Sequence, residues 1–311
     1  MSNQLELEQE LESELELELE SGREYAVIGP TDDRFHIPFR GPRPSTRLFP
    51  MNTICQLQQV TSTGLRNLGT GTLLSPRVVL TAKHVLRRLA GVTNPCRRVN
   101  RNGPFRSPIR VTPGAGRTPD FRRVVRPALP QSMDVNSSRF RTHPTLDFGV
   151  IILPQPFRRP TEFMMLQARG DANTATLLTI AGYPCDKLPS SLWGHSKRIP
   201  LTGVSPTHLR YTIDTCGGHS GSPIWLLGNN RIRLLLGIHT NGPSRCDNDP
   251  TRPGAQCRPT GASVTPVAGT NCGVRITCEV INQILTWCRA FGLTGRDLPR
   301  IDQVVFRRRC R

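Results

Sequence analysis

Long apolar runs, aromatic side chains and closely paired cysteines are scarce in this chain of 311 residues. No apolar stretch approaches the roughly 20 residues that a membrane-spanning helix needs, so we expect no membrane insertion. Aromatic residues form 5 % of the chain, and neither a base-stacking platform nor a recognition helix is visible. None of the ten cysteines forms the C-x-x-C pair typical of zinc sites. We therefore expect neither a metal ion nor a cofactor.

The first 24 residues are almost without basic side chains: they hold nine Glu and one Arg. Residues 5–20 read LELEQELESELELELE, an alternation that would suit a half-buried strand. Because nothing neutralises a Glu at every second position, a stable free strand is unfavourable. We interpret residues 1–24 as an acidic leader, either a disordered prosegment or a sorting tag. The leader also lacks the apolar centre of a secretory signal peptide.

The rest of the chain is strongly basic. Without the leader, 40 basic and 14 acidic residues remain, which raises the net charge from +18 to +26. Such a surface can attract nucleic acid or acidic substrates. The scarcity of aromatics favours a solvated basic exterior without a nucleic-acid partner. An even number of cysteines indicates an oxidising compartment, so we expect secretion by a route without a signal peptide, with a cytoplasmic location as the alternative.

Short apolar runs separated by Gly, Pro and Asn recur along the chain and predict an all-β fold of antiparallel sandwich or barrel type. They lie at 52–60, 69–75, 77–82, 148–153, 175–183, 208–214, 231–240 and 271–277. Residues 94–144 are rich in Arg and Pro with little periodicity, and we interpret them as long loops. Only residues 279–291 carry a helical apolar stripe. The pattern predicts a β-rich body closed by one C-terminal helix.

The strongest chemical signal is the segment DTCGGHSGSPIW at residues 214–225. A serine hydroxyl becomes a nucleophile only with a base within hydrogen-bond reach and N–H donors for the developing oxyanion. Gly217 and Gly218 permit a backbone conformation closed to other residues, which can turn two N–H groups inward. An ordinary Gly/Ser turn is the alternative. The strand-like runs on both sides favour Ser220 as a nucleophile.

Two further segments supply a candidate base and a candidate acid. VVLTAKHVL at 78–86 presents His84 after an apolar strand, although a lone histidine there is more often structural. LDFGVIIL at 146–153 places Asp147 before an apolar strand, where a carboxylate is costly unless it is hydrogen-bonded. Taken alone, Asp147 is either a cap at the strand start or the partner of the His84 ring.

With these motifs the chain resembles the chymotrypsin-like peptidases, and within them the bacterial glutamyl endopeptidases, over residues 26–292. The order His, Asp, Ser matches chymotrypsin and differs from subtilisin and the α/β-hydrolases. VIGPTDDR at 27–34 is similar to the start of the mature enzyme, and GIHTNG at 237–242 and NCGVRIT at 271–277 to the walls of the specificity pocket. The resemblance implies two antiparallel six-stranded β-barrels with a C-terminal helix.

The resemblance also implies a domain organisation and a reaction. We place the peptidase domain at 25–292, with the division between the barrels near 155–172, and a basic extension at 293–311. Ser220 attacks the scissile carbonyl, His84 transfers the proton, and Asp147 holds the imidazole. Backbone N–H groups of Gly218 and Ser220 form the oxyanion hole. We expect a monomeric serine endopeptidase that acts on proteins or peptides.

The residues expected in the specificity pocket give two competing predictions. The resemblance implies that His239 binds a glutamate side chain, with the Thr215 hydroxyl and Thr240 beside it. Asp214, six residues before Ser220, stands where trypsin-like enzymes bind Arg or Lys. A pocket-lining carboxylate would repel glutamate, so the two interpretations exclude each other. We favour cleavage after Glu (or Asp), with cleavage after Arg or Lys and an inactive homologue acting as a binding module as alternatives.

Two further expectations follow from the resemblance. Cys216 and Cys246 stand where a disulfide joins the pocket walls, a bond that stabilises by about 2–4 kcal/mol. Cleavage between Glu24 and Val27 would free an α-amino group and make the leader a self-processed prosegment. Trypsin-type activation instead needs an acid just before the nucleophile, and this chain has His219 there.

Overall fold

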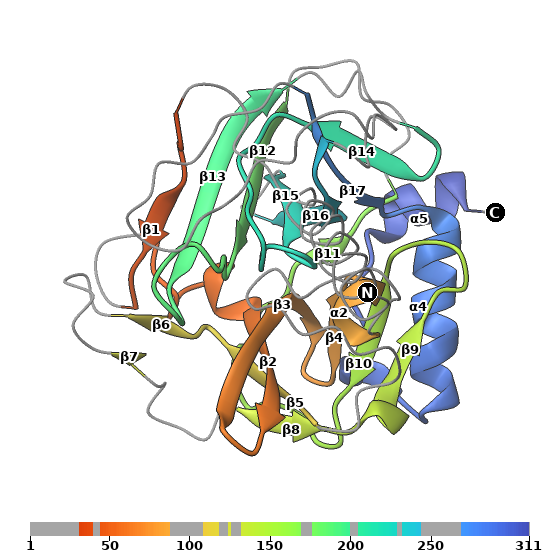
Figure 1. The fold of residues 1–311 in the computed structure, drawn as a ribbon. Coiled ribbons are helices and arrows are strands. Elements are labelled where there is room, and N and C mark those ends of the chain that lie inside the picture. The colour runs from red at the N-terminus through yellow and green to blue at the C-terminus, as the bar shows by residue number, and fades with distance from the viewer. Residues whose placement is uncertain are drawn as a thin grey trace, which may run out of the picture.

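The computed structural model describes residues 31–39, 44–87, 108–117, 124–125, 132–168, 176–199, 205–228, 232–243 and 269–310. The acidic leader and Cys246 lie outside the described residues. Two large sheets dominate the described part of the chain. Figure 1 shows one sheet above the other, with two helices along one side.

The first sheet has seven strands, and all of its neighbouring strands are antiparallel. In spatial order they are β8 (Met133–Val135), β5 (Ile109–Pro113), β2 (Ile54–Thr61), β3 (Gly64–Ser75), β4 (Val78–Thr81), β10 (Gly149–Ile152) and β9 (Phe140–Thr142).

The second sheet has eight strands and is antiparallel except for one short member. In spatial order they are β1 (Phe35–Ile37), β13 (Leu192–Ile199), β12 (Thr176–Gly182), β15 (Pro223–Leu227), β16 (Arg233–Asn241), β17 (Asn271–Arg275) and β14 (His208–Tyr211). The short member, β11 (Met165–Leu166), runs parallel to β16.

The remaining elements are short, apart from one helix. The pair β6 (Gly116–Arg117) and β7 (Val124–Val125) forms a separate two-stranded sheet. The helices are α2 (Lys83–Leu86), α4 (Cys278–Ala290), α5 (Gln303–Arg309) and 3-10 turns at Met51–Thr53, Ser137–Arg139 and Gly295–Asp297. None of the helices in the described ranges is long and apolar enough to cross a membrane.

The predicted all-β fold with two antiparallel barrel-like sheets and a C-terminal helix is confirmed. The sheets hold eight and seven described strands instead of six each, because strands of two or three residues such as β1, β8 and β11 extend them.

The prediction that residues 94–144 form only loops is wrong in part, because β5, β8 and β9 lie within this range. In β5 the buried Ile109 and Val111 alternate with half-buried residues, which is the pattern of a one-sided strand. Arg110 faces away from the core and forms a two-pronged ion pair with Asp134 on β8, directly opposite in the register. Arginines that look like loop composition therefore belong to the outer face of a strand.

The strands β4 and β10 pair at the centre of the molecule, and both are buried on both faces. Val79 of β4 packs inside the first sheet, whereas its neighbours Val78 and Leu80 pack in a second cluster that also contains residues of β10, β16 and α4. Alternate side chains of one strand thus enter two cores. Because both faces are apolar, these strands read as continuous apolar runs without alternation.

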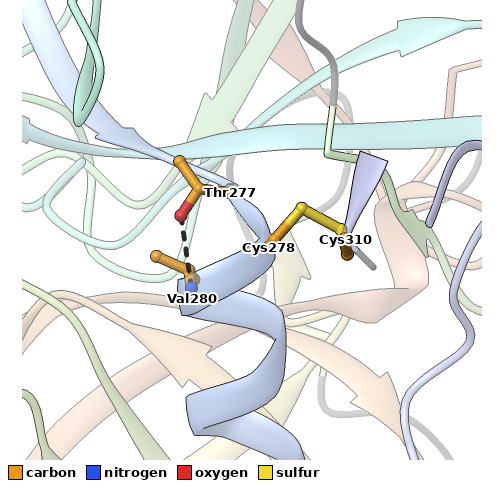
Figure 2. The surroundings of a disulfide bond; sticks show 4 residues. All are labelled: Thr277, Cys278, Val280 and Cys310. Carbon is orange, nitrogen blue, oxygen red and sulfur yellow. Dashed lines mark hydrogen bonds between the residues drawn. A yellow bond between two sulfur atoms is a disulfide. The ribbon is translucent and has the colours of Figure 1, made fainter. Parts of the chain in front are cut away.

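The helix α4 covers this central cluster, one residue out of step with the predicted range 279–291. Its N-cap is Thr277, whose hydroxyl accepts the Val280 N–H at 3.2 Å. Figure 2 shows this cap beside the disulfide between Cys278 and Cys310, which joins the start of α4 to the end of α5. The extension beyond residue 292 is therefore attached both covalently and through packing of Phe306 against the core.

Candidate active site

The pairing of the two central strands brings His84 and Asp147 together. His84 lies on α2 just after β4, and Asp147 lies two residues before β10. Because β4 and β10 are antiparallel, with Gly149 opposite Thr81, the end of one strand meets the start of the other. The Asp147 carboxylate accepts the His84 backbone N–H at 3.0 Å and lies 2.7 Å from the ring Nδ1.

The buried Ser220 completes this hydrogen-bonded chain from the turn before β15. Its Oγ lies 2.6 Å from His84 Nε2. Since an ionised carboxylate only accepts, Nδ1 carries the proton and Nε2 is left to accept from the serine hydroxyl. Burial by itself raises the pKa of Asp147, but the attraction and hydrogen bonds of His84 outweigh it and hold that pKa below its usual value. The carboxylate therefore stays ionised and fixes this tautomer.

The turn around Ser220 depends on two glycines in left-handed backbone conformations. Gly218 has a φ of 95° and Gly221 a φ of 83°. A Cβ on Gly218 would lie 2.3 Å from the Tyr183 carbonyl oxygen, and one on Gly221 2.1 Å from that of Thr70. Ser220 is also tied to the first sheet, because its carbonyl accepts the Thr70 N–H at 2.8 Å. Only glycine fits these two positions.

The residues predicted to recognise the substrate side chain are buried next to this turn. His239 and Thr240 lie on β16, and Thr215 lies in the segment that leads to Ser220. The predicted pocket walls GIHTNG and NCGVRIT fall on β16 and β17, which pair with His239 opposite Gly273. The Asn271 side chain donates to the Ile213 carbonyl at 2.8 Å and joins β17 to the segment before Thr215.

His239 has a buried partner that the sequence did not reveal. The Tyr211 hydroxyl on β14 lies 2.6 Å from His239 Nδ1. Burial and the nearby rings of His219 and His84 hold the pKa of His239 well below its usual value, so its ring is neutral. Burial raises the pKa of Tyr211 well above its usual value, so its hydroxyl keeps its proton and can donate to Nδ1.

Asp214 is buried, and residues outside the proposed pocket contact its backbone N–H and one oxygen of its carboxylate. Its carboxylate accepts the Asp33 backbone N–H at 2.8 Å and lies 3.3 Å from His195 Nδ1, while its own N–H donates to that nitrogen at 3.0 Å. Among the described residues, these three are the one group with the spacing to hold a metal ion. Hydrogen bonds within the group already use the Asp214 carboxylate and the His195 Nδ1, and we assign no metal to it.

The predicted bridge between Cys216 and Cys246 is described on one side only. Cys216 is buried and disulfide-bonded. Cys246 lies outside the described residues, so the identity of the partner stays a prediction.

Sequence reasoning also missed a buried ion pair behind the serine turn. Arg34 binds Asp186, which is 152 positions away in the sequence, and no local pattern joins the two. The available signal was the charged run Asp32, Asp33, Arg34 directly before β1, since charged side chains are almost never fully buried unless they are paired.

The chain is similar in sequence to trypsin-like proteins. The family model described as Trypsin matches residues 50–259. A glutamyl endopeptidase of Bacillus licheniformis is 26 % identical over 226 residues, which cover 70 % of this chain and 58 % of that protein. A glutamyl endopeptidase of Staphylococcus epidermidis is 27 % identical over 180 residues, 56 % of this chain and 54 % of that protein. The chain thus spans little more than half the length of these relatives.

A solved structure supports the same fold. The Glu endopeptidase determined in complex with MPD superimposes with a TM-score of 0.55 and 22 % sequence identity, over 85 % of this chain and 99 % of that one.

Proposed function

Because the chain belongs to the trypsin family, we propose that it is a serine endopeptidase in which Ser220, His84 and Asp147 form the catalytic triad. The carrying observation is the unbroken hydrogen-bonded chain from the Asp147 carboxylate through both nitrogens of the His84 ring to Ser220 Oγ. An inert serine turn would not need a base at 2.6 Å or a half-buried acid behind it.

The reaction follows from this chain of contacts. Ser220 Oγ attacks the peptide carbonyl carbon while its proton moves to His84 Nε2. The carbonyl oxygen becomes an oxyanion that accepts from the backbone N–H groups of Gly218 and Ser220. His84 then returns the proton to the leaving amine, which gives an acyl-enzyme, and water repeats the sequence to release the acid. The ionised Asp147 stabilises the imidazolium that forms in both halves.

We further propose that the enzyme prefers to cleave after Glu. Thr215 and His239 supply a hydroxyl and a neutral imidazole, both able to donate to a carboxylate. With Tyr211 donating to Nδ1, the His239 ring carries its proton on Nε2 as a donor. The opposing residue, Asp214, has its carboxylate Oδ2 engaged by the Asp33 backbone N–H, which argues against its use as a receptor for Arg or Lys.

The distribution of glutamate along the chain supports the same preference. Nine Glu lie in residues 1–24, and the other 287 residues contain only Glu162 and Glu279. Glu279 is in the first turn of α4, where the backbone is not extended for cleavage. The body also holds 40 Lys and Arg, which an Arg- or Lys-cutting enzyme would attack in its own copies. A Glu-cutting enzyme spares its body and removes its leader.

A peptide panel tests both parts of this proposal. Matched peptides carry Glu, Asp, Gln, Arg or Lys before a reporter amide, and Ser220→Ala protein serves as the blank. We expect the highest kcat/KM for Glu and none for the blank. Turnover by Ser220→Ala equal to that of the wild type would refute the triad, whereas a preference for Arg or Lys would refute the pocket assignment alone.

The cellular setting is also proposed. The disulfide between Cys278 and Cys310 supports an oxidising compartment and hence secretion. Leader removal near residues 24–27 is tested by N-terminal sequencing of active protein, and a sequence that still begins at Met1 would contradict it.

A further inference from the structure

A fully buried guanidinium lies behind the serine turn. The side chain of Arg34 has no exposed surface. It forms a two-pronged contact with Asp32, at 2.7 Å for both pairs of atoms, and a second one with Asp186, at 3.1 and 2.6 Å. Lys187 Nζ adds a further contact to Asp32 at 2.8 Å. Two carboxylates therefore hold one guanidinium in fork geometry.

The charges of this cluster persist over the ordinary pH range. Burial alone lowers the pKa of Arg34, but its hydrogen bonds to the two carboxylates outweigh burial and raise that pKa. Burial raises the pKa of Asp32, but Arg34 and Lys187 outweigh it and hold that pKa far below its usual value. A buried ion pair of this kind is costly to break, because the partner left behind is an unpaired charge.

The cluster lies directly against the segment that supports the oxyanion turn. Asp186 follows Cys185, whose N–H donates to the Gly217 carbonyl at 2.7 Å. A Cβ on Gly218 would lie 2.3 Å from the Tyr183 carbonyl oxygen and 3.1 Å from the Cα of Pro184. Residues 183–185 thus pack directly beneath the turn. The ion pair between Arg34 and Asp186 attaches the end of this segment to the residues that lead into β1.

The residue before the nucleophile cannot provide this anchor. The His219 ring is buried, and its Nδ1 lies 3.0 Å from the Cys216 backbone nitrogen. Burial and the positive charge of Arg34 lower the pKa of His219 to about 4, so the ring is neutral. A neutral ring that is hydrogen-bonded inside its own turn does not attract a freed α-amino group, as an acid at this position would.

We propose that Arg34 is a positioning residue for the oxyanion hole, which its ion pair with Asp186 assembles by holding residues 183–186 beneath Gly217 and Gly218. The guanidinium of an internal residue thereby supports the oxyanion turn, a role that the freed α-amino group has in trypsin-type activation. This inference rests on the proposed serine peptidase activity and is independent of the preference for Glu. It also means that removal of the leader does not build the hole.

The test compares Arg34→Met with Arg110→Met in the full chain. Arg110 forms a similar two-pronged pair with Asp134, but at the surface of the other sheet. The readouts are kcat and KM for the best reporter peptide, and the inhibition constant of the peptide aldehyde with the same sequence. The aldehyde forms a hemiacetal with Ser220 whose oxyanion needs the hole.

We expect Arg34→Met to lower kcat by about 10²- to 10³-fold, the loss typical of one missing oxyanion donor, with KM nearly unchanged. The aldehyde should lose affinity by a similar factor, and Arg110→Met should match the wild type in all three constants. Arg34→Lys keeps the charge without the fork and should recover part of kcat. Wild-type kcat and aldehyde affinity in folded Arg34→Met would overturn the inference.

A second variant covers failure of Arg34→Met to fold. Arg34→Met combined with Asp186→Leu removes both partners and leaves no unpaired buried charge. Loss of kcat in this folded double variant supports the inference, and wild-type kcat contradicts it. If the wild type is no more active than Ser220→Ala on any peptide, the proposed function itself fails. This outcome differs from the two outcomes of the double variant, both of which require an active wild type.

Discussion

Replacing Tyr211 with Phe isolates the contribution of one hydroxyl to substrate recognition. The hydroxyl lies 2.6 Å from His239 Nδ1, and both side chains are buried. A glutamate carboxylate only accepts hydrogen bonds, so it needs the ring form with the proton on Nε2. That form is favoured while Nδ1 accepts from Tyr211. Without the hydroxyl, keeping this form leaves a buried acceptor unpaired, which costs about 1–3 kcal/mol.

This cost has a measurable signature in the choice between two nearly isosteric substrates. If the cost of about 1–3 kcal/mol raises the free energy of the complex with the Glu peptide, kcat/KM for that peptide drops roughly 5- to 150-fold, since 1.4 kcal/mol is a factor of ten. A Gln peptide suits both ring forms, because its amide oxygen can accept from a protonated Nε2 and its amide N–H can donate to a bare Nε2, so its kcat/KM should change by less than about threefold. The assay is steady-state cleavage of the two peptides by Tyr211→Phe and wild-type protein, with thermal denaturation to verify folding. An unchanged ratio of Glu to Gln cleavage would refute the role given to Tyr211.

The remaining predictions concern the turn, pH and the disulfide. Gly218→Ala should reduce kcat by at least about 100-fold because a Cβ would lie 2.3 Å from a backbone oxygen; peptide hydrolysis checks this, and wild-type turnover would contradict it. Folding lowers the pKa of His219 to about 4 from 6.5, so the unfolded chain binds the extra proton first and stability falls as pH drops through this window, by at most about 3 kcal/mol. Urea unfolding at pH 7 and pH 4.5 should therefore differ less in folded His219→Gln, and an equal difference would count against the buried neutral ring. Replacing both Cys278 and Cys310 by Ser opens a loop with a sequence separation of 32 residues. Chain entropy predicts that the free energy of unfolding falls by about 4 kcal/mol while kcat is unchanged. An unaltered midpoint of urea unfolding would show that packing alone holds residues 293–311 in place.

The residues proposed for the triad could be named from the sequence because local patterns carry them. Two glycines around a serine, a histidine after an apolar strand and an acid before another are short motifs, and antiparallel pairing of β4 with β10 is enough to bring two of them together. Most of the long strands and the C-terminal helix follow from the apolar runs of the sequence, whereas the order of the strands in each sheet does not.

The supporting residues could not be predicted because their partners are distant in sequence. Arg34 and Asp186 meet across 152 positions, and Tyr211 and His239 across 28. Each pair has a meaning only once the chain has folded. β5 escaped detection for another reason: its outward Arg110 disguised the alternation of its buried residues.

The disulfide at the start of α4 gives the chain a covalent ring that tolerates a cut. Glu279 immediately follows Cys278, so the bond that the proposed preference selects in this helix lies inside the ring closed by Cys310. The helical turn protects this bond while it is folded, so a neighbouring molecule can cut it only after the start of α4 has unwound; a copy nicked in that way keeps its last helices attached through the disulfide. Such a nick stays silent in a non-reducing gel and releases a fragment only when the disulfide is reduced. A copy cut at this bond therefore stays in one covalent piece for as long as the disulfide remains oxidised.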